Sequence, residues 1–168
     1  MKHITIFAPL LIVFAIIGCT DNLPKDLPKC YPCKITVIQD GAPLADATVI
    51  LQLPEVGQMW FPLGVTDETG TANMLTNGRY PGAPQGTYKV LVSKVVRGES
   101  RLGPPPPEGS PAYHQWAERS ANETISEYHI VDPQYNDVQK TPHEIEVKAK
   151  GPNAVTIDVG KPVKVLNP

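Results

Sequence analysis

Two cysteines three positions apart, Cys30 and Cys33, are the residues of this chain whose spacing most directly suggests chemistry. Attachment of haem through two thioethers requires a histidine directly after the second cysteine, and Lys34 stands there. A redox centre lowers the pKa of its first thiol at a helix N-terminus, whereas residues 34–38 are rich in the β-branched side chains typical of a strand. A closed zinc site needs four ligands, and the chain has no second cysteine pair. The spacing therefore favours a disulfide, with redox catalysis and zinc binding as the remaining alternatives.

Formation of that disulfide requires a bend between the two cysteines. In an extended strand, Cα atoms three residues apart are separated by about 10 Å, which exceeds the limit of roughly 7 Å for a disulfide. Pro32 lies between the cysteines, where a bend is needed. Closing so short a loop contributes only about 2 kcal/mol in the chain-entropy model. The bridge would fix the start of the first strand more than it would stabilise the domain.

The segment before this pair begins with an export signal, which we assign to residues 1–18. Its apolar run, Ile4–Ile17, is shorter than a typical membrane span. The following Gly18 and Cys19 are similar to the end of a bacterial lipobox, in which the cysteine is acylated and becomes the first residue of the mature protein. An ordinary secretory signal and an uncleaved anchor are the alternatives. We expect lipidation at Cys19 and anchoring to a membrane of the cell envelope. The residue after the cysteine is Thr20, which resembles the sorting signal of lipoproteins that are sent to the outer membrane.

The composition of the chain argues against a nucleic-acid partner. Its 15 Lys and Arg are balanced by 17 Asp and Glu, and no basic run is present that would bind phosphates. The remainder after cleavage, residues 19–168, has the length of one domain. We therefore expect a single exported domain, held to a membrane by lipid alone.

Alternation of apolar and polar residues predicts a series of short strands. Ile35 and Val37 share one face of the first strand, and Ala47, Val49 and Leu51 share one face of the second. About seven strands joined by turns are typical of an all-β, Greek-key sandwich of the immunoglobulin-like or transthyretin-like kind. The strands are expected near 34–39, 47–53, 60–66, 71–75, 87–96, 144–148 and 155–159. The predicted organisation is a tether at 19–32, the sandwich at 33–160 and a C-terminal tail at 161–168.

One part of the sandwich departs from this pattern, and we interpret residues 97–130 as an insertion. Pro104–Pro107 favour an extended polyproline II conformation. Ser110 is suited to cap a helix that has Pro111 at its first position. Apolar residues recur after it at helical spacing. The insertion is therefore expected to contain one short helix that crosses between sandwich strands.

Three turn-and-strand motifs resemble the carboxypeptidase regulatory-like, or transthyretin-like, domain. They are G-A-P-L-A-D-A-T-V at 41–49, T-D-E-T-G at 66–70 and P-G-A-P-Q-G-T-Y-K-V at 81–90, and residues 132–159 are similar to the ending of many lipoproteins from planctomycete-type bacteria. The resemblance implies a β-sandwich and says little about function. Gly41 and Gly70 are expected to adopt positive φ in tight turns. Where that ending commonly has Leu, this chain has His143.

The sequence contains none of the motifs of the enzymes that share this general sandwich. It lacks the Tyr-Arg-Gly-Ser ending of hydroxyisourate hydrolases and the His-x-His of intradiol dioxygenases, and it has no phosphate-binding loop or zinc-protease motif. Glu144 and Glu146 share one strand face and are expected to face solvent. We therefore predict no catalytic residues, no metal and no cofactor.

Aromatic residues are the remaining candidates for binding. Tyr113 and Trp116 lie on the insertion, and Trp60 and Tyr80 lie near strand ends. Such rings suit stacking on sugars or proteins, and the alternative is a satellite core that fixes the insertion to the sheet. The expected function is a structural or binding role at the envelope, with an unidentified envelope protein or carbohydrate as partner. An accessory glycan-binding or metal-binding protein of an uptake system is the second hypothesis, and an enzyme with an unrecognised site is the third.

Overall fold

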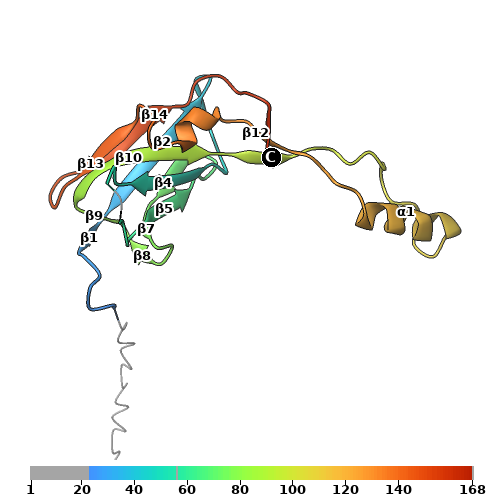
Figure 1. Ribbon diagram of the computed structural model, residues 1–168, viewed down its shortest axis with the longest axis horizontal. Helices are drawn as coiled ribbons and strands as arrows, with labels where there is room; N and C mark the ends of the chain where they lie inside the picture. Colours follow the sequence, from blue (N-terminus) through green and yellow to red (C-terminus); the bar gives the residue numbers. More distant parts are fainter. Residues whose placement is uncertain (1–22, 56, 168) are drawn as a thin grey trace, which may run out of the picture.

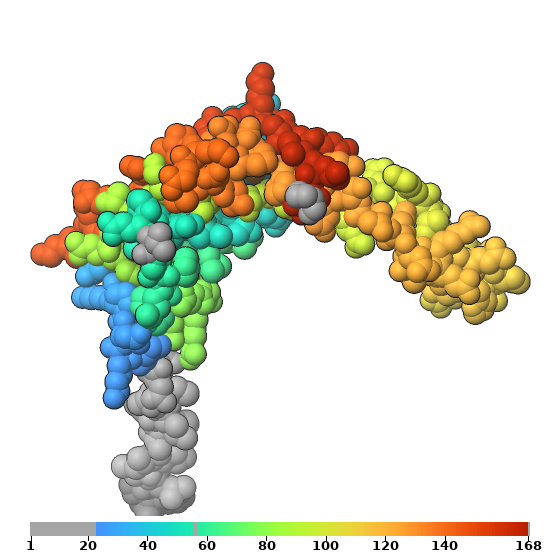
Figure 2. All heavy atoms as spheres, in the orientation of Figure 1, coloured from blue at the N-terminus to red at the C-terminus, as the bar shows by residue number. Residues whose placement is uncertain are grey.

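The computed structural model describes residues 23–55 and 57–167 and consists of a β-sandwich body with a long arm. Figure 2 shows the arm, coloured yellow to orange, leaving one side of the body. The expected all-β sandwich with one short helix is confirmed. The predicted count of seven strands is not reproduced, because the described chain forms fifteen strand segments, several of only two residues.

The larger sheet of the body contains six strands, in which β10 lies between β4 and β13. All its pairings are antiparallel. In sheet order the strands are β13 (Glu144–Val147), β10 (Gly86–Ser93), β4 (Thr48–Gln52), β5 (Pro62–Val65), β7 (Leu75–Thr76) and β8 (Tyr80–Pro81).

The smaller sheet of the body is centred on β2 (Cys33–Gln39). The last strand of the body, β14 (Asn153–Asp158), pairs with β2 in parallel over six residues. Antiparallel pairing joins β2 to β3 (Ala42–Pro43) and to β6 (Thr71–Asn73). Parallel pairing needs a long connection, and here almost the whole domain forms that connection. The pairing of β2 with β14 therefore joins the beginning of the body to its end.

The core lies between the two sheets and follows the predicted alternation. Ile35 and Val37 of β2 are completely buried, and so are Ala47, Val49 and Leu51 at β4. Burial of a Val, Leu or Ile side chain stabilises a fold by roughly 1.5–3 kcal/mol. These few residues therefore account for much of what holds the two sheets together.

Strand β10 is the longest strand of the body, and its centre, Val90–Val92, is buried on both faces. Val90 and Val92 face the core, and Leu91, on the opposite face, is 5% exposed. The segment that contains the 3₁₀ helix η1 (Pro133–Asn136) packs beside β10. The nearby Thr141 hydroxyl donates a hydrogen bond to the Val90 carbonyl at 2.9 Å.

Tight turns connect the strands at the predicted glycines. Gly41 and Gly70 have φ of 78° and 74°, as expected. Gly70 also needs to be glycine for a second reason, because a Cβ there would lie 2.5 Å from the Val37 carbonyl oxygen. In the same turn the Asp67 carboxylate accepts hydrogen bonds from Thr69 and Thr71, and these bonds lower its pKa.

The arm begins where the predicted strand 87–96 divides at Lys94. Beyond it, β11 (Val95–Arg97) and β12 (Glu127–His129) form a hairpin that extends out of the body. The helix α1 (Pro111–Ala121) lies at its tip, with Ser110 as the N-cap and Pro111 in the first turn, as predicted. The expectation that the helix crosses between sandwich strands is wrong, because Figure 1 shows α1 held away from both sheets.

Two segments expected to lie outside the sheets contain strands. Residues 161–168 were predicted as a tail, but β15 (Val165–Leu166) pairs with β12 and widens the hairpin to three strands. The predicted tether contains β1 (Cys30–Tyr31), and the predicted loop at 77–86 contains β9 (Ala83–Pro84). These two strands pair with each other. Both pairings join residues distant in the sequence, and neither short segment carries an alternating pattern.

Candidate functional site

The two cysteines lie on different strands, and the predicted disulfide is not formed. Cys30 belongs to β1 and Cys33 begins β2, with Pro32 making the expected break between them. Both thiols are free. The Cys30 sulfur lies 3.4 Å from the Thr76 hydroxyl, whereas Cys33 points into the core and is 3% exposed. The side chain of Cys33 continues the buried face of β2. The two thiols therefore lie in different surroundings and do not act as a pair.

The environment of Cys33 also disfavours redox chemistry. Burial raises the pKa of its thiol to about 11, so the nucleophilic thiolate is scarce near neutral pH. Cys33 lies in a strand and not at a helix N-terminus. The residue therefore acts as a small apolar side chain of the core.

The four predicted binding aromatics form two separate pairs. Tyr113 and Trp116 stack on α1, with ring centroids 6.2 Å apart and an interplanar angle of 28°. Trp60 and Tyr80 meet edge to face in the body, at 6.3 Å and 75°. The structure thus places one pair at the tip of the arm and the other at an end of the sandwich.

The alternative interpretation of the arm aromatics, a satellite core against the sheet, is wrong. None of the residues of α1 is buried. The Trp116 indole N–H donates to the Gly103 carbonyl at 3.3 Å, so this ring fixes the helix to the outgoing chain of the arm itself. The aromatic pair is half-buried by the arm, with its remaining surface open to solvent.

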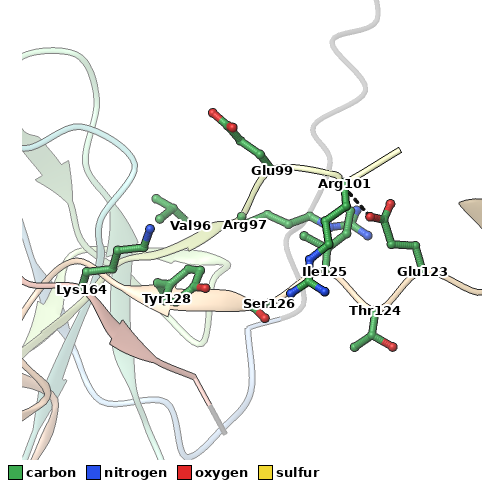
Figure 3. A pocket seen from close by; sticks show the side chains of 11 residues that line it. Val96, Arg97, Glu99, Arg101, Glu123, Thr124, Ile125, Ser126, Tyr128 and Lys164 are labelled. Carbon is green, nitrogen blue, oxygen red and sulfur yellow. Dashed lines mark hydrogen bonds between the residues drawn. The ribbon is translucent and has the colours of Figure 1, made fainter. Parts of the chain in front are cut away.

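A polar cavity of about 400 Å³ lies at the base of the arm. Figure 3 shows its residues on both sides of the hairpin, with Lys164 and Tyr128 near the body and Arg101 and Glu123 farther out. Arg97 extends between these two groups. Three cationic and two carboxylate side chains, including Glu99, surround the cavity, so polar or charged ligands suit it best.

Two sets of contacts give this cavity its shape. The Glu123 carboxylate accepts hydrogen bonds from the Ser100 hydroxyl at 2.6 Å and from the Arg101 backbone N–H at 2.7 Å. The bond from Ser100 is the main cause of a lowered pKa at Glu123, and the two bonds join the outgoing and returning chains of the arm. On the other side, the Lys164 ammonium lies 4.5 Å from the centre of the Tyr128 ring.

Sequence reasoning did not identify this cavity. Its charged side chains come from the outgoing chain, the returning chain and the C-terminal segment, which are far apart in the sequence. No spacing pattern links them. The pairing of β15 with β12 brings Lys164 to the others.

The residues in and next to β13 that resemble catalytic groups make contacts with neighbouring residues. Glu144 forms an ion pair with Lys89 at 2.8 Å, and Glu146 forms one with Lys148 at 2.9 Å; both carboxylates are exposed, as predicted. The His143 ring stacks on Tyr135 at 5.5 Å and lies 3.0 Å from the Asp158 carbonyl oxygen. Across the two described ranges, no group of three or more His, Cys, Asp or Glu side chains is arranged to hold a metal ion.

The comparisons with known proteins leave the resemblance as a prediction. No family model matches the chain, and no similar protein was found among the curated proteins or the solved structures. The predicted signal 1–18 and Cys19 lie outside the described residues. In the described part, no helix is long and apolar enough to cross a membrane.

Proposed function

We propose that this protein is an exported lipoprotein, anchored through Cys19, whose transthyretin-like sandwich supports the arm as a binding surface at the cell envelope. The observation that carries the proposal is helix α1, which the hairpin holds away from the body with no buried residue. A helix that adds nothing to the core must be maintained for another reason. The stacked Tyr113 and Trp116 offer the amphipathic rings that are frequent in protein and sugar recognition. No catalytic role is proposed.

The anchor can be tested by fractionation of cells that produce the full chain. Cys19→Ser should move the protein from the membrane fraction to the soluble fraction, because a thiol is needed for acylation. Cys30→Ser is the matched control and should stay in the membrane fraction. Unchanged fractionation of Cys19→Ser would contradict lipidation at this residue.

The binding role of the arm can be tested by photo-crosslinking in intact cells. A photoreactive amino acid placed at position 116 should give a discrete crosslinked species with an envelope protein or glycan. The control position is Val65, which is 58% exposed on the body. Equal crosslinking from both positions, or none from position 116, would contradict a dedicated binding surface on the arm.

A second candidate function is supported by the cavity at the base of the arm. Its size and its ring of Arg97, Arg101 and Lys164 suit a small polar ligand, as an accessory protein of an uptake system would require. Metal uptake has less support, since the described residues offer no metal-binding cluster. Replacement of Arg97 and Lys164 by Ala would abolish ligand binding at this cavity without affecting crosslinking from position 116.

A further inference from the structure

One end of the body carries an apolar groove of about 380 Å³, at the point where the described chain begins. The groove is lined by Leu23, Leu27, Cys30 and Tyr80, together with three prolines. Leu23 is 59% exposed. Figure 1 shows this blue segment beside β8. The groove lies where the described chain begins, four residues after the proposed lipid anchor at Cys19. A membrane surface is therefore the occupant to consider.

One further aromatic side chain extends this surface. Trp60 packs against Tyr80. Two hydrogen bonds of 2.8 Å between Phe61 and Asn77 hold the segment of Trp60 beside the turn before β8. We call Leu23, Leu27, Trp60 and Tyr80 the tether-end surface.

The charges around the tether-end surface are mainly positive. Lys25, Lys29 and Arg79 are exposed, and Asp26 is the one carboxylate among residues 23–31. The Arg79 guanidinium lies 5.6 Å from the centre of the Tyr80 ring. Trp and Tyr rings favour the level of lipid headgroups, and nearby Lys and Arg are attracted to anionic lipids. The combination matches a membrane surface better than a glycan, which would not require the positive rim.

The length of chain between anchor and groove limits how far this surface can lie from the membrane. Four residue steps separate Cys19 from Leu23, so their Cα atoms are at most about 14 Å apart. The segment after Leu23 is fixed to the body, because it lines the groove and continues into β1, which pairs with β9. We propose that the tether-end surface rests in the headgroup region of an anionic membrane and orients the body there. This inference depends on the proposed anchor at Cys19.

The two tryptophans of the chain allow a direct test. The full chain, purified from membranes with its native lipid, is reconstituted in vesicles of phosphatidylethanolamine and phosphatidylglycerol that contain brominated phospholipid. Trp116→Phe leaves Trp60 as the reporter, and Trp60→Phe leaves Trp116. Brominated lipid should remove most of the fluorescence of Trp60 and leave that of Trp116 unchanged. In the Trp60-reporter protein, Leu23→Ser, in the groove, should reduce the quenching, and the control Val65→Ser, outside the groove, should not.

The outcomes separate the inference from the proposed anchor. Vesicle flotation reports anchoring, and thermal unfolding of each variant confirms that it is folded. If the protein floats with the vesicles but Trp60 is not quenched, the anchor stands and the membrane-resting surface is wrong. Quenching of Trp116 alone would show the opposite orientation and would also overturn the inference. If the protein does not float, both the anchor and the inference fail.

Discussion

The body and the arm are both built around antiparallel strands, yet different interactions hold them together. In the body, side chains such as Val37, Leu51 and Val90 are completely buried between two sheets. In the arm, Val95 and Leu166 are 42% and 58% exposed, and no residue of α1 is fully buried. The arm is maintained by strand pairing and by a few exposed hydrogen bonds, which typically contribute about 0.5–1.5 kcal/mol each. Stability is therefore concentrated in the body, and the arm can change without loss of the fold.

The largest expected effect compares two leucines. Leu51→Ala would leave a cavity between the sheets and should lower the free energy of unfolding by about 2–5 kcal/mol. Leu102→Ala, in the arm, removes a side chain that is only half-buried and should change it by about 0.5 kcal/mol or less. Urea unfolding measures both. Similar losses would show that the arm belongs to the same cooperative core as the sandwich.

A smaller effect is expected from two glycines with similar backbone conformations. Gly70 and Gly103 have φ of 74° and 67°. A Cβ at Gly70 would collide with the Val37 carbonyl, whereas nothing lies within 4 Å at Gly103. Gly103→Ala should therefore lower the free energy of unfolding only by the strain of a left-handed alanine, about 1–2 kcal/mol or less. Gly70→Ala should lower it clearly more. Equal midpoints of thermal unfolding would mean that the turn at Gly70 can relax.

The smallest effect is expected from replacement of most of the arm. A short Gly/Ser linker in place of Gly98–Thr124 removes α1 and leaves the hairpin pairing of β11 with β12 intact. Loop entropy changes by only about 0.6 kcal/mol for each doubling of loop length, so the midpoint of thermal unfolding should shift by less than about 4 °C. A retained cooperative transition supports an arm that the sandwich does not need. Loss of the folded state would show that the arm completes the core.

Local features of the fold could be predicted from the sequence because they depend on neighbouring residues. Alternation at Ile35 and Val37 predicted a half-buried strand, and the pair Ser110 and Pro111 predicted the start of a helix. Gly70 was assigned to a tight turn. Each of these follows from backbone geometry or capping within a few residues, and the structure confirms them.

The tertiary structure decided how distant segments meet. The parallel pairing of β2 with β14 and the addition of β15 to β12 join residues 36 to 120 positions apart. Cys30 and Cys33 are close in sequence, yet their strands direct the two thiols to different surroundings. The same holds for the aromatics, which divide between the arm and the tether-end surface. Short strands with little pattern of their own have many possible partners, and only the burial of the assembled core selects among them.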